Sequence, residues 1–401
     1  MRIRIKIFAI ACIVMIGLSG FSKCGSPSSV IIDNNSSIIE DDVNQTSRVI
    51  QEADISESLT YVKELDREYA NKFRVFYYED GYVLLMTTED NARFLIVPEG
   101  KEIPEDIDED VCVIERPVEN MYIVASAVMD MFASLDGIDS IKYSGKKEED
   151  WYIKEAAEAM QEGRMIYAGK YSKPDYEMIV SGDCSLIVEN TMIFHSPEVK
   201  EKFEEFGIPV MVEYSNYEEH PLGRVEWVKF FGALLGEDEI AGKIYEEQRD
   251  IVNSVKDSEP SNKTIAYFYI TSNNLIQVRK SSDYIPKMIE LAGGKYIYEN
   301  LEGEEENQLM VNMSVEQFYN DAKDADIIIY NSSIDGGVKS LEELYAKSEL
   351  LKDFKAVKEG NVWCTANDMY QQSLSVGYMI EDINNVLNDK DDNLHYLFRL
   401  E

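Results

Sequence analysis

Residues 213–260 read EYSNYEEHPLGRVEWVKFFGALLGEDEIAGKIYEEQRDIVNSVKDSEP and lie near the middle of the chain. Pro221 suits the first turn of a helix, where a backbone N–H has no intrahelical partner. Gly236 is a candidate interruption, and Pro260 ends the pattern. The stretch predicts one long linker helix over 221–259. Its apolar residues recur at helical spacing: Leu222, Val225, Val228, Leu235, Ile240, Ile244, Ile251 and Val255.

The composition narrows the class of protein. The chain has 401 residues, enough for two or three domains. With 76 acidic and 39 basic residues, its formal net charge is −37, and such a field repels nucleic-acid phosphates and anionic lipid surfaces. We therefore expect no nucleic-acid partner, and membrane attachment only through an anchor. The five cysteines have no CxxC or paired spacing, so a disulfide scaffold is not expected.

The N-terminus has the features of an export signal. Basic residues precede an apolar run over 7–18 that is shorter than a membrane span. Residues 1–24 therefore resemble the signal peptide of a bacterial lipoprotein, with Cys24 as the lipidation site. Phe21 to Lys23 fit a lipobox poorly, because small residues are expected there. Two outcomes stay open: a lipid anchor at the outer face of the cell membrane, or simple secretion. Residues 25–54 are polar and predict a flexible tether.

The remaining chain predicts an α/β fold. Residues 55–118 predict a helix over about 55–70 and a β-meander of about three strands. Residues 119–220 contain a strand–helix–strand unit, which implies a parallel sheet and a right-handed crossover. Residues 260–401 repeat the alternation after the linker helix. The predicted fold is two Rossmann-like lobes with parallel sheets, joined by a single long helix with a cleft between them, plus an N-terminal β-meander.

Two segments, one on each side of the predicted linker, have similar sequence patterns. PDYEMIVSGDCSLIVEN (174–190) and SVEQFYNDAKDADIIIYN (314–331) each combine a short acidic helix, a buried strand and a terminal Asn. This weak internal repeat predicts two equivalent lobes.

Residues 120–388 resemble the substrate-binding proteins of ABC importers for ferric siderophores, haem or cobalamin. The segments that carry the resemblance occur in order: MYIVASAVMDMFASLDGIDSI, KPDYEMIVSGDCSLIVENTMIFHSPEVKEKFEEFGIPV, EEHPLGRVEWVKFFGALLG, SSDYIPKMIELAGGKY and MSVEQFYNDAKDADIIIYNSS. The resemblance implies two lobes joined by a rigid helix that closes little on the ligand. It also implies one exposed glutamate per lobe that docks onto arginines of the permease, and Glu177 and Glu316 match those positions. The implied partners are an ABC permease and its ATPase, and a monomer is expected.

The loops after the predicted strands supply a candidate ligand site, because ligands of open parallel sheets bind outside the carboxyl ends of strands. Arginine and lysine there are local cations in an acidic protein, which suits an anionic ligand; the alternative is solubility or an internal salt bridge. Three histidines are too few for a dedicated zinc or manganese site, so no resident metal or cofactor is expected. The candidate ligand-binding residues are Ser126, Asn190, Met192, Phe194, His195, Tyr217, Arg224, Arg279, Lys280, Tyr284, Asn331 and Tyr370.

The resemblance implies an extracytoplasmic solute-binding protein that captures a ferric siderophore or similar iron chelate and delivers it to the permease. Cobalamin, another corrinoid or haem is the alternative ligand of the same type. The sequence has no GxSxG, HExxH, P-loop or GxGxxG motif, so no enzymatic activity is expected. A secreted α/β hydrolase or a surface sensor remains the alternative of another class.

Overall fold

The computed structural model describes residues 52–303, 309–332 and 337–401. The chain divides into two compact units, Met1–Arg48 and Val49–Glu401, and all the described residues belong to the second. The predicted signal peptide, Cys24 and nearly all of the predicted tether lie outside the described residues. No helix within the described part of the chain is long and apolar enough to cross a membrane.

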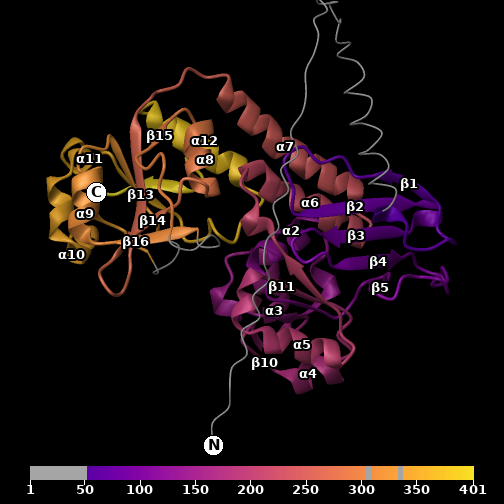
Figure 1. The fold of residues 1–401 in the computed structure, drawn as a ribbon. Coiled ribbons are helices and arrows are strands. Elements are labelled where there is room, and N and C mark those ends of the chain that lie inside the picture. The colour runs from indigo at the N-terminus through magenta and orange to yellow at the C-terminus, as the bar shows by residue number, and fades with distance from the viewer. Residues whose placement is uncertain (1–51, 304–308, 333–336) are drawn as a thin grey trace, which may run out of the picture. The chain divides into compact units, whose positions relative to one another are not determined.

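The first described element is a five-stranded sheet, called the N-terminal sheet below (Figure 1). Neighbouring strands are antiparallel except β4 and β5, which are parallel. The helix expected over 55–70 is corrected, because strand β1 occupies part of that range. Pairing with β2 overrides the local helical preference. The strands follow chain order: β1 Tyr61–Glu64, β2 Phe73–Tyr78, β3 Val83–Thr87, β4 Arg93–Val97 and β5 Val111–Glu115.

The first lobe is a parallel sheet with the order β12-β11-β6-β7-β8. Numbered along the chain within the lobe, this is the doubly wound order 3-2-1-4-5, and its switch point lies between β6 and β11. The crevice outside these two strand ends is the expected place for a ligand. The strands are β6 Met121–Ile123, β7 Ile141–Ser144, β8 Ile166–Tyr167, β11 Ile187–Asn190 and β12 Val210–Glu213; the helices are α2 Ser126–Ser134, α3 Lys154–Gln161, α4 Tyr176–Ser181 and α5 Pro197–Glu205. A separate small ladder pairs β9 Gly169–Lys170 with β10 Lys173–Pro174.

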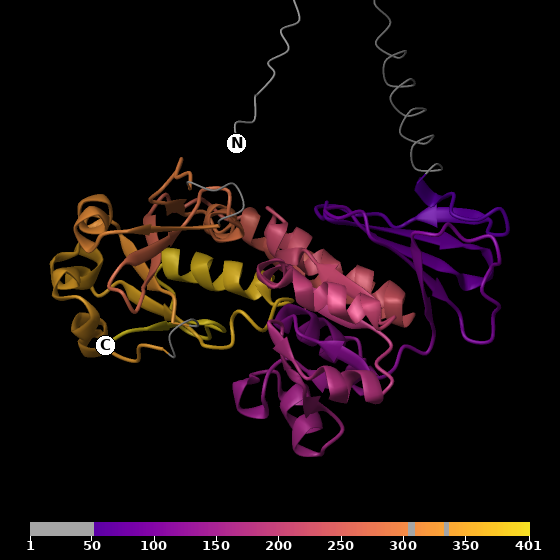
Figure 2. The same cartoon turned by 60° about the horizontal axis from the view of Figure 1, so that its bottom comes forward.

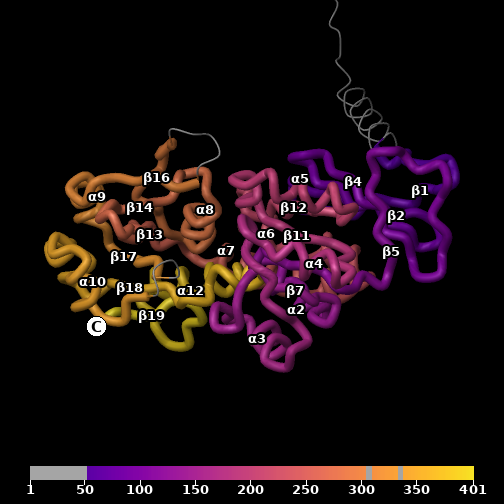
Figure 3. Tube along the Cα trace, turned by 90° about the horizontal axis from the view of Figure 1, so that it is seen from below, coloured from indigo at the N-terminus to yellow at the C-terminus, as the bar shows by residue number. Residues whose placement is uncertain are grey.

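The second lobe has a mixed sheet with the order β16-β14-β13-β17-β18-β19 (Figure 3). Strand β15 also pairs with β13. The central strands β13, β17 and β18 are parallel, whereas β14, β16 and β19 are antiparallel to their neighbours. The strands are β13 Thr264–Ile270, β14 Ile276–Arg279, β15 Lys295–Tyr296, β16 Met310–Met313, β17 Ile327–Tyr330, β18 Val362–Thr365 and β19 Leu397–Arg399; the helices are α8 Tyr284–Leu291, α9 Val315–Ala322, α10 Leu341–Lys347, α11 Lys355–Glu359 and α12 Val376–Leu387.

The linker is two helices, α6 Pro221–Leu235 and α7 Asp238–Lys256, where a single long helix was expected (Figure 2). Gly236 ends α6 in the left-handed conformation, with a φ of 90° that disfavours any residue with a side chain. The two helices then pack closely, because a Cβ on Gly232 would lie 2.5 Å from the Cβ of Ala241. Helix α7 contacts α12 of the second lobe and so connects the two lobes.

Helix α6 is apolar on nearly all sides, as expected of a helix buried all round. It packs against α7, against α2 of the first lobe and against β2 and β3 of the N-terminal sheet. The Phe73 ring of the sheet lies 5.0 Å from the Trp227 ring and 5.4 Å from the Phe230 ring. The N-terminal sheet therefore shares a hydrophobic core with the linker and the first lobe.

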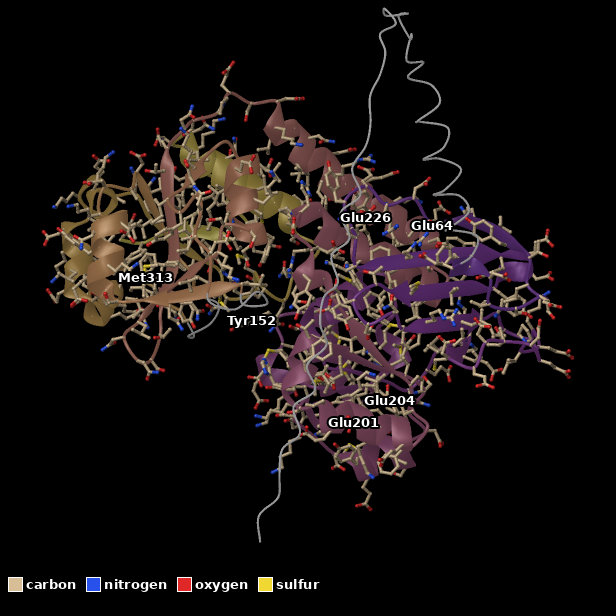
Figure 4. All side chains as sticks on the ribbon, in the orientation of Figure 1. Glu64, Tyr152, Glu201, Glu204, Glu226 and Met313 are labelled. Atoms are coloured by element: carbon tan, nitrogen blue, oxygen red, sulfur yellow. The ribbon has the colours of Figure 1, made fainter. Side chains whose placement is uncertain are left out.

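Two buried carboxylates of the linker region also hold the loop before β2. Glu226 lies where α6 meets the N-terminal sheet (Figure 4), and its carboxylate accepts the backbone N–H groups of Glu68, Tyr69 and Ala70 at 2.9 Å. Glu218 accepts the N–H groups of residues 71 and 72 at 2.9 Å. A buried carboxylate needs such donors, since an unpaired charge would be costly there.

Candidate functional site

The switch point of the first lobe carries two predicted site residues. Ser126 begins α2 just after β6, and Asn190 ends β11. The Asn190 amide oxygen accepts the Met192 N–H at 2.9 Å and so begins the short helix η4, Thr191–His195. Phe194 in this turn is 49% exposed and Met192 is 44% exposed. The turn therefore presents apolar side chains to solvent next to the switch point.

The second lobe covers the start of α2. The Ser373 hydroxyl donates to the Ala127 carbonyl at 2.9 Å, and the Leu374 N–H donates to the Asp130 carboxylate at 2.8 Å. Burial raises the pKa of Asp130 to about 6. Tyr152, seen where the first lobe faces the second (Figure 4), donates its N–H to the Gln371 side chain at 2.9 Å. These contacts hold the lobes together on one side of the interlobe region.

A buried polar cluster of the second lobe brings together three more predicted residues. The Arg279 guanidinium lies 3.3 Å from the Asp283 carboxylate and donates to the Tyr370 hydroxyl. The Asn331 amide donates to the same hydroxyl at 2.9 Å. Asp283 thus balances the charge of Arg279. This internal salt bridge is the alternative to an anionic ligand that the sequence analysis left open. Lys280, the next residue, is also buried.

Arg224 is a different kind of cation. Its guanidinium stacks 4.0 Å from the centroid of the Tyr284 ring, and it donates to the Ser215 carbonyl at 3.1 Å. Within the described ranges it forms no salt bridge, so its charge is not neutralised by a carboxylate in contact. Helix α6 supplies Arg224 and helix α8 supplies Tyr284, so this pair joins the linker to the second lobe. Burial keeps the pKa of the Tyr284 phenol above its ordinary value.

Two adjoining cavities lie beside these residues. The first, of about 240 Å³, is lined by Tyr217 and Tyr284 together with residues of the N-terminal sheet. The second, of about 530 Å³, is lined by His220 and by one side of α8. Glu219, Ser282 and Asp283 line both, which shows that the cavities are neighbours. Together they have the size of a site for one bulky small molecule.

A smaller void of about 30 Å³ is lined by Arg224, Tyr284 and Tyr370. It has room for a water molecule but not for a bulky ligand. Of the cluster of Arg279, Asn331 and Tyr370, only Tyr370 lines this void, and none of the three lines the two larger cavities.

The structure brings together only some of the predicted ligand-binding residues. Tyr217 and Tyr284 line the 240 Å³ cavity, and Arg224 contacts Tyr284. The turn with Met192, Phe194 and His195 lines neither cavity. Residues missed by the sequence reading line the two cavities: Lys72 and Glu89 of the N-terminal sheet, and Tyr296 and Tyr298 after α8. The alternating aromatic pattern of KYIYEN was a signal for the last two, whereas nothing local marked Lys72 or Glu89.

His220 lines the larger cavity. Its ring stacks 3.9 Å from the Tyr69 ring, and its Nδ1 accepts the Leu222 N–H at 3.2 Å. Burial lowers the pKa of His220 to about 4, so the imidazole is neutral at pH 7. Across residues 52–303, 309–332 and 337–401, no group of three or more His, Cys, Asp and Glu could hold a metal ion.

The two glutamates matched to permease docking have equivalent settings. Glu177 lies in the first turn of α4 and Glu316 in the first turn of α9, and both are exposed. Each helix has a side-chain N-cap, since Asp175 accepts the Met178 N–H at 3.0 Å and Ser314 accepts the N–H of residue 317 at 3.1 Å. One such carboxylate therefore projects from each lobe.

The arrangement of two lobes and a helical linker is similar in fold to solved two-lobed periplasmic binding proteins. A periplasmic heme-binding protein of Vibrio cholerae superposes with a TM-score of 0.53 at 12% identity, covering 66% of this chain and 97% of that protein. A periplasmic vitamin B12-binding protein of Vibrio cholerae gives 0.50 at 15% identity, covering 69% and 99%. These solved proteins leave about a third of this chain without a counterpart.

Among relatives in sequence, the chain is 25% identical over 398 residues to an uncharacterized lipoprotein of Methanocaldococcus jannaschii. The match covers 92% of this chain and 89% of that protein. No family model matches the chain.

Proposed function

We propose that this chain is an extracytoplasmic solute-binding protein that captures a ferric siderophore or similar iron chelate and delivers it to an ABC-transporter permease. The observation that carries the proposal is Arg224, which forms no salt bridge among the described residues and stacks on Tyr284, a residue that lines the 240 Å³ cavity. In a chain of net charge −37, such a cation favours an anionic ligand. Phenol rings around it supply contact area for a bulky chelate.

A corrinoid or haem is the second candidate ligand. The 530 Å³ cavity is lined by Tyr296 and Tyr298, whose rings meet edge to face at 5.7 Å, and the less buried Tyr298 ring could contact a macrocycle. Solved neighbours with this fold bind haem or vitamin B12, which supports a ligand of this size.

The same proposal places the chain outside the cytoplasm. The basic and apolar N-terminus and the lipoprotein names of its relatives support export, with Cys24 as the site of a lipid anchor. As a monomer, the chain would meet its permease through Glu177 and Glu316. Exposed charges of this kind set orientation and association rate more than affinity.

Ligand titration tests the proposed function. The purified chain is titrated by intrinsic fluorescence with a ferric tris-catecholate, a ferric hydroxamate, haem and cyanocobalamin. We expect the ferric chelates to bind most tightly. Arg224→Gln should weaken an anionic chelate by about tenfold or more, the range of one hydrogen bond to a charged group. Arg164→Gln is the matched control, because Arg164 is paired with Asp139 at 2.6 Å on the surface.

Two results would contradict the proposal in different ways. Tight binding of cyanocobalamin with no binding of ferric chelates would replace the proposed ligand. Absence of binding by all four probes would refute the solute-binding function itself.

Docking is tested separately by the double variant Glu177→Ala and Glu316→Ala. We expect unchanged ligand affinity and strongly reduced ligand uptake by cells that carry the permease. The matched control is Glu201→Ala with Glu342→Ala, two exposed helical glutamates that also lie one on each lobe. Normal uptake with the docking variant would refute this role.

A further inference from the structure

The N-terminal sheet reaches the proposed ligand cavity at one end of its β2–β3 pair. Lys72 precedes β2 and Glu89 follows β3. The two segments are joined there by a hydrogen bond from the Thr88 N–H to the Lys72 carbonyl at 3.0 Å. Both residues line the 240 Å³ cavity together with Tyr217 of the first lobe and Tyr284 of the second. Three parts of the chain therefore enclose this cavity.

The backbone at this end of the sheet is fixed. The Lys72 N–H donates to the Glu218 carboxylate at 2.9 Å, and the same carboxylate accepts the Trp227 indole N–H at 3.1 Å. Three N–H groups just before it are held by Glu226, whose side chain is fully buried. The position of the Lys72 backbone is thus tied to helix α6 by buried, charge-assisted hydrogen bonds.

The side chain of Lys72 is held much less firmly. Its ammonium lies 2.8 Å from the Glu89 carboxylate, and both side chains keep about a third of their surface exposed, 29% and 35%. An ion pair this exposed contributes little to stability. The ammonium can therefore leave Glu89 for another anion without a large loss of stability.

We propose that the N-terminal sheet is a third wall of the ligand site and that Lys72 contacts the bound solute, exchanging Glu89 for an anionic group of the ligand. This inference rests on the proposed function of the cavity as a solute site. The fixed backbone sets where the ammonium can reach, and the weak ion pair leaves it free to change partner. Lys72 thereby adds a cation to a cavity whose other charged lining residues in the described chain, Glu89, Glu218, Glu219 and Asp283, are acidic.

Lysine labelling with and without ligand tests the contact. The full chain is treated with an acetylating reagent in the presence and absence of saturating ferric tris-catecholate, haem or cyanocobalamin, and modification at each lysine is read by mass spectrometry. We expect a several-fold loss of labelling at Lys72. Lys101 is the matched control, because it also forms an exposed ion pair within this part of the chain, 2.9 Å from Asp80. Its labelling should not change.

The same samples separate the two levels of the argument, because binding is followed in them by fluorescence. If a probe binds while Lys72 stays fully reactive, the proposed contact of Lys72 with the solute is refuted and the proposed function stands. Absence of binding by every probe overturns both.

Affinity gives an independent readout. Lys72→Gln should weaken the ferric tris-catecholate by about two- to fivefold, the range of an exposed ion pair. Glu89→Gln should strengthen it, because the competing carboxylate is removed, and Lys101→Gln should leave affinity unchanged. Equal affinities for the Lys72, Glu89 and Lys101 variants would contradict the exchange of partners.

Discussion

The buried carboxylate of Glu226 is the contact that most directly ties the N-terminal sheet to the linker. It accepts three backbone N–H groups from residues 68–70 and the Lys229 ammonium at 2.7 Å. Glu226→Gln preserves the volume of the side chain but removes its charge. One acceptor oxygen is replaced by a donor NH₂ group, which then faces other donors.

The magnitude follows from these contacts. Each of the three backbone bonds changes from charge-assisted to neutral or is lost, at roughly 1 kcal/mol apiece. The Lys229 ammonium loses its partner in a half-buried place, which brings the total to about 3–4 kcal/mol. The expected effect is therefore a loosened N-terminal sheet and a lower free energy of unfolding.

Urea unfolding followed by circular dichroism measures this loss. With a urea slope of about 3 kcal/mol per M for a chain of this size, the midpoint should fall by about 1 M. Limited proteolysis should also begin to cut near residues 66–72. The control is Glu239→Gln, the same chemical change on an exposed glutamate of α7, which should leave the midpoint unchanged. An unaltered midpoint and cleavage pattern for Glu226→Gln would refute the role of this carboxylate.

Three further predictions concern other parts of the fold. Gly232→Ala should destabilise the chain by about 1–3 kcal/mol by pushing α6 from α7, whereas Gly242→Ala, with nothing within 4 Å of its added Cβ, should not; equal urea midpoints would contradict this. Burial raises the pKa of Glu189 to about 8 from an ordinary 4.5, so the folded chain holds a proton that the unfolded chain releases. The stability that this proton gives is complete below pH 4.5 and is lost as pH rises to about 8. The Glu189→Gln variant should therefore gain stability relative to the parent chain between pH 5 and 8, and the same difference in urea midpoint at both pH values would contradict this. The buried Asp382 carboxylate accepts the N–H groups of residues 395–397 at 2.9, 2.6 and 3.1 Å, and Asp382→Asn should weaken these hydrogen bonds. Faster amide exchange at those residues is expected, and unchanged exchange would refute this anchoring role.

The ends of several strands could be predicted from sequence, because strand ends are local features. The βα alternation placed Asn190 at the end of one buried strand and Asn331 and Tyr217 after two others; the structure has them there, and Tyr217 lines the 240 Å³ cavity. The sequence also marked Gly236 as a candidate break, and the structure makes it the end of α6. The partner of Arg279 could not be predicted from sequence. Its ion pair with Asp283, four residues further on, depends on how the end of β14 meets the start of α8.

The sequence by itself determined the two α/β lobes, the helical linker between them and the strong negative charge. These follow from hydrophobic periodicity and composition, which act over a few residues at a time. Only the tertiary structure decided that the linker folds back as a close helix pair, that two buried glutamates fasten the N-terminal sheet to it, and that Lys72 of that sheet faces the cavity. The last two of these depend on residues more than a hundred positions apart, such as Glu226 and Ala70, and local patterns carry no information about such pairings.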